Sequence, residues 1–432
     1  MAENKENLMG KIVSLCKRRG FIFPGSEIYG GFGGFYDFGP LGVEMKNNLK
    51  NLWWKWMTVE HENIVGIDGA IITNPKVWEA SGHVESFVDP LSECKKCHKR
   101  FKADDIEGKK CPDCRGELTE PKKFNILMPV QIGVIDGEKV NAYLRGEACQ
   151  TIYLNYKNIL NTTRLKIPFG VCQIGKAFRN EVTPGNFLFR QREFEQWDLQ
   201  WFCHPKEMEK WFDFWKKERM EWYKNLFTNP KNLGFYKHEK LAHYAKKAFD
   251  IVYEKSPCEI KEIEGIHWRG DWDLSRHQQY SGQDLSYTDS ETKEKFIPQI
   301  VETSGGVDRM FLFLLIDAYT EEKERIVLKL NPKVAPYKVA VFPLLANKPK
   351  LIEKARNIYL ELKKQFSVVW DDRGNIGKRY YAQDEAGTPY CITVDFDTLE
   401  KNDVTVRDRD TMKQDRIKID ELAEYLSQKL NA

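Results

Sequence analysis

Two β-rich runs joined by a short turn, over residues 171–202, constrain the fold of this chain more than any other segment. The runs Val171–Val182 and Phe187–Phe202 flank the turn Thr183-Pro184-Gly185-Asn186. Proline, glycine and asparagine between two such runs are typical of an antiparallel hairpin. The segment therefore predicts a long hairpin, and an antiparallel sheet with ordinary cross-strand ion pairs is its simplest interpretation.

A helix and two more strands are predicted after the hairpin. In Lys206–Phe227, large apolar residues recur at helical spacing, which is typical of a core-facing helix. Glu259–Ile266 and Phe296–Ser304 have strand composition. Two glycines then lead into an apolar helix from residue 307 to about residue 319.

The region before the hairpin begins with a glycine-rich loop at residues 26–42. A dinucleotide-binding fingerprint is excluded there, because Tyr36 replaces the third glycine and no hydrophobic strand precedes the loop. A close-packed turn is the alternative. A helix over 43–57 and a strand-like run over 64–73, ended by Pro75, are predicted next.

The chain has 432 residues, enough for two or three domains of roughly 150 residues each. A break near residues 331–336 separates the predicted sheet from a segment with a different pattern. Strands are predicted there at 337–342, 367–370, 390–394 and 404–407, with helices at 349–365 and from 420. This α/β alternation predicts a separate C-terminal domain over 334–432.

Composition restricts the compartment more than the partner. The 67 Lys and Arg residues against 64 Asp and Glu leave a net charge of +3, which neither indicates nor excludes a nucleic-acid partner. The longest apolar run, Met310–Ile316, is far short of the roughly 18 residues that span a membrane. The first 20 residues mix both charges and predict an amphipathic helix without a signal-peptide pattern. A cytoplasmic protein without a membrane partner is expected.

Four of the ten cysteines form two CxxC pairs, Cys94/Cys97 and Cys111/Cys114, with thirteen residues between the pairs. Such knuckles place four thiolates at the corners of the tetrahedron that Zn²⁺ prefers. The spacing predicts a structural zinc site, with unrelated thiols as the alternative. His98 is either a substitute ligand or a solvated loop residue. Basic residues around the knuckles either contact an RNA backbone or form a solvated face.

The second strand of the hairpin carries a chemically distinctive face. Strand alternation places five residues on one side: Arg190, Arg192, Phe194, Gln196 and Asp198. The other side of the strand carries Glu193, Glu195, Trp197 and Leu199. Guanidinium groups suit phosphate, an aromatic ring stacks on a base, and a carboxylate holds an ammonium group. The face therefore fits a phosphate, an adenine and an amine, with plain cross-strand pairing as the alternative.

Arg309 stands in the first turn of the apolar helix, where a cation opposes the helix dipole. A bound phosphate at that end would reverse the penalty, which indicates a ligand role.

These segments together resemble the class II aminoacyl-tRNA synthetases. Phe178-Arg179-Asn180-Glu181, the turn at 183–186 and Arg192-Glu193-Phe194 resemble motif 2. Gly306-Val307-Asp308-Arg309 resembles motif 3, and residues 43–75 resemble motif 1, which builds the dimer interface in that class. Within the class, residues 36–42, Ser81-Gly82-His83 and Phe194-Glu195-Gln196 resemble the dimeric type of glycyl-tRNA synthetase.

The resemblance implies an α+β fold, with a class II antiparallel sheet flanked by helices. The implied catalytic domain covers 1–333, with a zinc-knuckle insert at 88–125 and a helical insertion at about 205–258. An α/β anticodon-binding domain would cover 334–432. A homodimer through the motif 1 region is also implied.

The implied reaction activates glycine with ATP to glycyl-adenylate, releases pyrophosphate, and transfers glycine to tRNA(Gly). In the family pattern Arg179 holds the α-phosphate and the attacking carboxylate, while Glu181 and Phe194 contact adenine. Arg190 and Arg309 bind the outer phosphates, and Mg²⁺ joins them with Glu262 as its protein ligand. The full set of positions matching the ATP site is Arg179, Asn180, Glu181, Phe189, Arg190, Arg192, Phe194, Glu262, Ile263, Gly306 and Arg309.

Glycine would be selected by its ammonium group and by exclusion of anything larger. The matching positions are Glu147, Gln196, Asp198, Arg269, Glu302 and Ser304. Two departures from the family pattern stand out: residues 145–150 are Arg-Gly-Glu-Ala-Cys-Gln instead of Arg-Pro-Glu-Thr-Ala-Gln, and Asp198 replaces a glutamate. Alternatives are a class II synthetase for another small amino acid and a non-catalytic, synthetase-like nucleic-acid-binding subunit.

Overall fold

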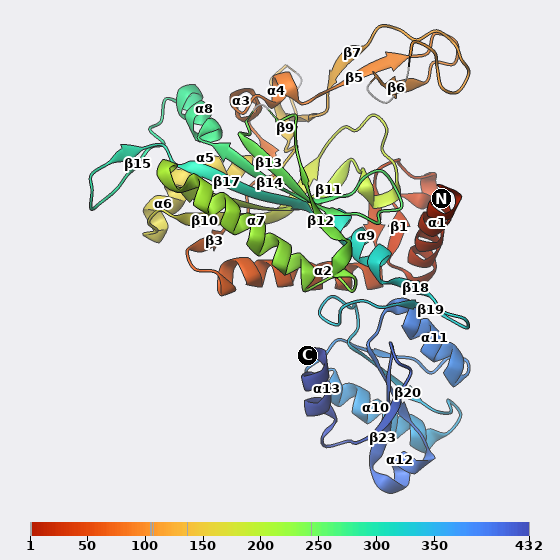
Figure 1. Cartoon of the computed structure of the whole chain (residues 1–432). Coiled ribbons are helices and arrows are strands. Elements are labelled where there is room, and N and C mark those ends of the chain that lie inside the picture. The colour runs from red at the N-terminus through yellow and green to blue at the C-terminus, as the bar shows by residue number, and fades with distance from the viewer. Residues whose placement is uncertain (1, 104–105, 107, 136, 243, 432) are drawn as a thin grey trace.

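The computed structural model describes residues 2–103, 106, 108–135, 137–242 and 244–431. Its main body is a seven-stranded sheet in the order β12-β13-β14-β17-β11-β10-β3 (Figure 1). In that order the strands span Leu233–Lys237, Lys247–Tyr253, Glu262–Gly270, Gln299–Gly306, Glu193–Cys203, Phe169–Phe178 and Ile64–Gly66. Neighbouring strands are antiparallel except β10 with β3, so the predicted antiparallel sheet is confirmed.

The predicted hairpin is present, but its strands are shorter than expected. Strand β10 ends at Phe178 and β11 begins at Glu193, while residues 179–192 form a loop with a short 3₁₀ turn. Asn186 and Phe187 have φ of 54° and 57°, a left-handed backbone that a strand does not tolerate. The extension of the strands to residues 182 and 187 was therefore wrong, and the three predicted arginines, Arg179, Arg190 and Arg192, lie in the loop.

One face of the sheet is covered by long helices whose apolar sides form the main core (Figure 1). These helices are α2 Pro40–Lys55, α7 Met208–Lys224 and α9 Val307–Ala318. Helix α1 Ala2–Arg19 lies to the side of the sheet and adds apolar residues to the same core. Trp197 and Leu199 of β11 point into this core, as the strand alternation predicts. In the same core, the rings of Trp53 and Trp197 stack 5.7 Å apart.

The opposite face of the sheet carries a smaller apolar cluster beside an open, polar region. Its helices are α5 Gln150–Leu154, α6 Tyr156–Thr163 and α8 Trp272–Ser281. Small two- and three-stranded sheets lie around the main sheet: β1 Ile22–Pro24 with β2 Tyr36–Phe38, β15 Tyr287–Thr288 with β16 Lys295–Phe296, and β4 Ile72–Thr73 with β8 Met128–Ile132 and β9 Val140–Leu144. One part of this face is thus covered by packed apolar side chains, and the other part is accessible to a ligand.

Two predicted segments differ from the structure. Residues 205–258 contain helix α7 but also strands β12 and β13, which belong to the main sheet. A helical insertion is therefore the wrong description, because the segment completes one edge of the sheet. The strand-like run 64–73 is divided between β3 and β4, which pair in separate sheets.

The predicted motif 1 helix is longer than expected. Helix α2 starts at Pro40, where a proline is favourable in the first helical turn, and a π-helical segment continues it over Trp56–Glu60. After β4, two short helices follow, α3 Pro75–Ala80 and α4 His83–Ser86.

The cysteine-containing insert projects from the main body as a separate three-stranded sheet (Figure 1). Its strands are β5 Val88–Glu93, β6 Arg100–Lys102 and β7 Lys122–Asn125. Residues 104, 105 and 107 of the predicted insert lie outside the described residues.

The C-terminal segment forms its own sheet in the order β21-β20-β22-β23-β24 and its own apolar cluster. The strands span Val368–Trp370, Val339–Pro343, Tyr390–Val394, Asp403–Asp408 and Gln414–Lys418. The helices are α10 Pro349–Leu362, α11 Ile376–Ala386, α12 Phe396–Lys401 and α13 Leu422–Asn431. The predicted α/β alternation is confirmed, although helices α11 and α12 and strand β24 were not anticipated.

The hairpin β18 Tyr319–Glu321 and β19 Ile326–Leu328 joins the two parts of the chain. Buried Arg325 of this hairpin contacts Asp384 of α11 at 2.9 Å, and Arg407 also pairs with Asp384. Within the described residues, no helix is both long and apolar enough to cross a membrane.

Candidate active site

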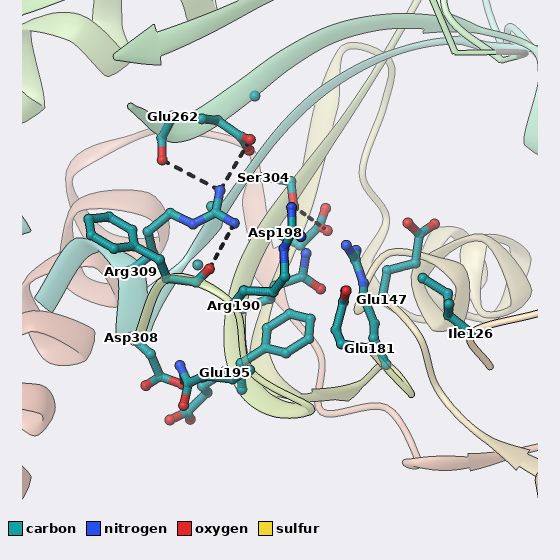
Figure 2. Close-up of a pocket in the computed structure, with 18 of the residues that line it drawn as sticks. Ile126, Glu147, Glu181, Arg190, Glu195, Asp198, Glu262, Ser304, Asp308 and Arg309 are labelled. Atoms are coloured by element: carbon teal, nitrogen blue, oxygen red, sulfur yellow. Dashed lines mark hydrogen bonds and ion pairs between the residues drawn. The ribbon is translucent and has the colours of Figure 1, made fainter. Parts of the chain in front are cut away.

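A cavity of about 410 Å³ opens on the polar face of the main sheet (Figure 2). Its walls come from β11, β14 and β17, from the loop after β10, and from the start of α9. Acidic side chains gather at one end of the cavity, and arginines with an aromatic ring line the rest. The cavity therefore offers separate environments for a cation and for an anion.

The acidic end is built by strand register. Asp198 of β11 lies opposite Ser304 of β17, and the Ser304 hydroxyl donates to the Asp198 carboxylate at 3.1 Å. Two residues before Ser304 on β17, Glu302 lies opposite His267 of β14. Because side chains two residues apart share a face, both carboxylates point into the same cavity. Glu147, which precedes α5, completes the acidic end.

Basic side chains in and behind the cavity wall fix two of these carboxylates. Arg269 donates to both oxygens of Glu302 at 2.9 and 3.1 Å, and the His267 ring contacts Glu302 at 2.7 Å. Burial alone would raise the pKa of Glu302, but Arg269 and His267 lower it. Similarly, the His83 ring lies 3.0 Å from Glu147 and, against the effect of burial, holds the pKa of that carboxyl well below its usual range.

Asp198 has the opposite electrostatic environment. Burial, together with the neighbouring charge of Glu302, raises the pKa of Asp198 well above its usual range. Two carboxylates this close do not ionise together without a cation between them. The acidic end thus has a missing positive charge, which a small ammonium group would supply.

The arginine end begins at Arg179, directly after β10. Its guanidinium donates to the carbonyl of Gly146 at 3.0 Å and lies 4.9 Å from the Phe87 ring and 5.3 Å from the Phe194 ring. Contact with two aromatic faces and one carbonyl restrains the long side chain. Arg179 is thereby preorganised between the acidic end and the rest of the cavity.

Arg309 closes the other side of the cavity (Figure 2). Its guanidinium contacts the Glu262 carboxylate at 3.1 Å and the carbonyl of Phe189 at 3.3 Å. Desolvation at the cavity wall would raise the pKa of Glu262, whose side chain is 48% exposed, but the charges of Arg309 and His267 lower it. An ionised carboxylate beside a guanidinium at this end is suited to a metal–phosphate ligand.

A β-bulge explains why Glu262 faces the cavity together with His267. The register of β13 against β14 shifts at this point, so that Ile251 and Val252 lie opposite Glu264 and Glu262, with Ile263 unopposed. The extra residue reverses the alternation of side chains along the strand. Even-numbered Glu262 and odd-numbered His267 therefore share one face.

A buried ion-pair network supports the site from below. Lys46 of α2 lies 2.9 Å from Glu195 of β11 and 2.5 Å from Asp308 at the start of α9. Asp308 also accepts the backbone N–H of Glu195 at 2.9 Å. Burial alone would lower the pKa of Lys46, but Asp308 and Glu195 raise it. The network ties three elements together at the residues that border the cavity.

The structure brings most of the predicted site residues to one cavity. Those in its wall are Glu147, Arg179, Glu181, Phe189, Arg190, Phe194, Gln196, Asp198, Glu262, Glu302, Ser304, Gly306 and Arg309. Their placement from segments far apart in the sequence is what the resemblance to motifs 2 and 3 implies.

Four predicted site residues lie outside the cavity wall. Arg269 is buried behind Glu302 and also pairs with Asp273 at 2.8 Å. Arg192 donates to the carbonyls of Glu181 and Gly33, and Ile263 is packed in the main core. Asn180 donates its backbone N–H to Ile126. The loop turns Arg192 away from the cavity and the bulge turns Ile263 away from it. Both residues therefore contact the protein itself and not the cavity.

Other residues at the cavity were not predicted from sequence. Asp89 and Lys102 of the insert, paired at 2.7 Å, line its rim, and Tyr244 and His267 line its inner part. His267 lies two residues before Arg269 on one strand, so alternation along β14 was the signal for it. The contacts of the insert with the cavity had no signal in the local sequence.

The four predicted zinc ligands lie together in the insert. The Cys94 and Cys114 sulfurs are 3.4 Å apart, those of Cys97 and Cys111 are 3.7 Å apart, and all four lie within 4.8 Å of one another. A tetrahedral zinc with bonds of about 2.3 Å spaces its sulfurs by about 3.8 Å, so the four thiols fit that ion. His98 is 76% exposed and contacts Glu93, which agrees with a solvated loop residue.

Comparison with known proteins agrees with this geometry. Residues 133–319 match the model of the class II tRNA synthetase core domain (G, H, P, S and T), and residues 338–429 match that of the anticodon binding domain. Proteins named glycine–tRNA ligase are similar over nearly the whole chain. One from Treponema denticola is 51% identical and covers 97% of this chain and 96% of its own.

Relatives with the same name from Thermobifida fusca and Borreliella burgdorferi are each 49% identical. The first covers 99% of both chains, and the second covers 97% of this chain and 96% of its own. Identity at this level, over the cavity and both matched domains, assigns the family. The chain belongs to the glycine–tRNA ligase family of class II aminoacyl-tRNA synthetases.

Proposed function

We propose that this protein activates glycine with ATP and transfers the glycyl group to the terminal adenosine of tRNA(Gly). The observation that carries the proposal is the acidic end of the cavity, where Glu147, Asp198 and Glu302 surround a space next to Arg179. A small ammonium group fits there, and a bulky side chain does not. No protein nucleophile is required, because the amino acid carboxylate itself attacks the α-phosphate.

In the proposed complex ATP occupies the arginine end. Phe194 stacks on the adenine and Glu181 contacts its edge, while Phe189 and Gly306 border the nucleotide. Arg179 stabilises the charge that develops at the α-phosphate, since it lies between this end and the carboxylates. Arg190 and Arg309 receive the outer phosphates, and pyrophosphate leaves on their side.

Glycine occupies the acidic end. Its ammonium group contacts Asp198 and Glu302, with Ser304 and Gln196 beside them, and Arg269 acts through Glu302 instead of touching the substrate. Exclusion of a methyl group is a steric effect, which discriminates better than a weak preference between apolar groups.

Mg²⁺ is proposed to bind with ATP, and Glu262 is its best protein ligand because its carboxylate lies beside Arg309 at the phosphate end. The ion would supply charge neutralisation for the phosphates. Glu262 would hold the ion, and Arg309 beside it would bind the outer phosphates.

A structural zinc is proposed for the four cysteines of the insert. Replacement of Cys111 by serine is expected to lower bound zinc from about one to below about 0.3 per chain, because a four-thiolate site loses much of its affinity with one ligand. Limited proteolysis should then cut within 88–125 while the catalytic body resists. Metal analysis with thiol titration checks this, and the same change at buried Cys172 is the control. Wild-type protein with reduced thiols and little zinc would contradict the site.

The raised pKa of Asp198 predicts a pH dependence for glycine binding. Above that pKa the carboxylate is ionised and pairs with the ammonium group, and as pH falls through it the pairing is lost. The KM for glycine should therefore rise as pH falls, whereas the KM for ATP should change little. Pyrophosphate exchange across a pH series measures both constants. Asp198→Asn should have a high KM for glycine and a flat profile; an unchanged profile would exclude Asp198 as the titrating group.

The remaining parts suggest further roles. We infer a homodimer through residues 43–75, where Val43, Trp54 and Ile72 are exposed, and light scattering of the purified protein tests it.

Domain boundaries at 1–333 and 334–432, with tRNA binding by the second part, rest on the separate apolar clusters and on the anticodon-domain match. We also infer that the reaction takes place in the cytoplasm, where ATP and tRNA are supplied.

The direct test of the proposed function is charging of a tRNA mixture with radiolabelled glycine. Acid-stable label on tRNA(Gly) alone is expected. Charging in parallel assays with radiolabelled serine or alanine, and not with glycine, would favour the alternative of another small amino acid. Tight tRNA binding without any charging would favour the non-catalytic alternative.

A further inference from the structure

Gln200 lies directly behind the acidic end of the cavity without lining it. The residue is on β11, two positions after Asp198 and opposite Glu302 of β17. Its side chain is fully buried. A buried amide beside two carboxylates needs a defined set of partners, because an unsatisfied polar group there is costly.

The amide nitrogen of Gln200 bridges the two carboxylates. It donates to Oε1 of Glu302 at 2.9 Å and also donates to Oδ1 of Asp198. The amide oxygen accepts a hydrogen bond from the hydroxyl of buried Tyr153 at 2.6 Å. One side chain therefore links both carboxylates to helix α5.

Tyr153 gives the amide a single orientation. A carboxylate accepts hydrogen bonds, so both carboxylates require the NH₂ end of Gln200. The reversed amide would turn its oxygen toward the carboxylate oxygens, and the Tyr153 hydroxyl would then accept from the amide instead of donating to it. The carboxylates thus specify the orientation, and in it the Tyr153 hydroxyl donates to the amide oxygen.

The bridge also divides the oxygens of each carboxylate by role. Oδ1 of Asp198 faces Gln200, while Oδ2 accepts from Ser304. Oε1 of Glu302 receives Gln200 and Arg269, while Oε2 receives Arg269 and His267. Removing the bridge would leave two mutually repelling carboxylates free to turn apart.

We propose that Gln200, oriented by Tyr153, is a positioning residue that sets the spacing of Asp198 and Glu302 for the ammonium group of the substrate. This inference rests on the proposed glycine site. Because the Gln200 amide is neutral, it holds the two carboxylates together without neutralising their charge. That charge stays available to the ammonium group. The bridge therefore contributes to affinity for the amino acid and not to affinity for ATP.

The test compares Gln200→Met with the wild type in glycine-dependent ATP–pyrophosphate exchange. Methionine keeps the length and the volume but cannot donate to the carboxylates. Loss of hydrogen bonds to charged groups should raise the KM for glycine about 10- to 100-fold, with the KM for ATP within about twofold. Gln383→Met is the matched control, because it removes another buried amide in the C-terminal domain.

Tyr153→Phe provides a second variant that removes only one hydroxyl. It should raise the KM for glycine by a smaller factor, about 3- to 10-fold, because the amide keeps its bonds to the carboxylates but loses the bond that anchors it to helix α5. This variant decides the question if Gln200→Met does not fold.

The outcomes separate the two proposals. Glycine-dependent exchange by the wild type, with the KM for glycine unchanged in both variants, would overturn the role of Gln200 alone. Equal increases in both KM values would also overturn it, since they indicate general disruption. Absence of exchange by the wild type would overturn the glycine site and the inference together.

Discussion

Replacement of Arg179 by alanine is expected to lower the rate of glycine-dependent pyrophosphate exchange by about 10³-fold or more. The guanidinium is held by Gly146, Phe87 and Phe194 between the two ends of the cavity. In the proposed transition state it is the cation closest to both the carboxylate and the α-phosphate. Steady-state exchange kinetics at saturating substrates measure the loss in kcat.

Two comparison variants make this result specific. Arg179→Lys keeps the charge but not the planar fork, so it should recover only a small part of the rate. Arg309→Ala should act mainly on the KM for ATP, because Arg309 faces Glu262 at the outer-phosphate end. Thermal melting controls for folding. Arg179→Ala with wild-type kcat would remove this arginine from the mechanism.

Replacement of Arg219 by methionine should destabilise the catalytic domain by about 3–5 kcal/mol. Arg219 of α7 and Glu264 of β14 are completely buried, and the guanidinium contacts the carboxylate at 2.5 and 2.9 Å. Tyr223 and Trp197 donate to the same carboxylate. Removing the arginine leaves a buried negative charge under the sheet that carries the cavity.

Urea unfolding followed by tryptophan fluorescence measures this loss in the catalytic domain, because of the 12 tryptophans only Trp370 lies beyond residue 333. The double variant Arg219→Met with Glu264→Gln removes the uncompensated charge and should recover much of the stability. A loss below about 1 kcal/mol for Arg219→Met would show that the ion pair contributes little.

Strand alternation is the part of the site that the sequence predicts best. The period of two placed Phe194 and Asp198 on one face and Trp197 on the other, and the structure confirms it. The spacing of the cysteine pairs likewise anticipated four clustered thiols. In both cases a local repeat determines the geometry, so no knowledge of distant contacts is needed.

Features that depend on distant contacts escaped sequence analysis. The bulge at Ile263 changes which residues of β14 face the cavity, and the pattern of residue types does not reveal it. The left-handed backbone at Phe187 shortens the hairpin strands. Partners such as His83 and Glu147 meet across more than 60 residues of chain, and only the folded sheet brings them together.

The most direct test of the central claim is ATP–pyrophosphate exchange measured separately with each of the twenty amino acids. The geometry of the acidic end predicts rapid exchange with glycine, and exchange with alanine and serine slower by about 10²-fold or more. No exchange with glycine, or equal exchange with alanine, would contradict the account.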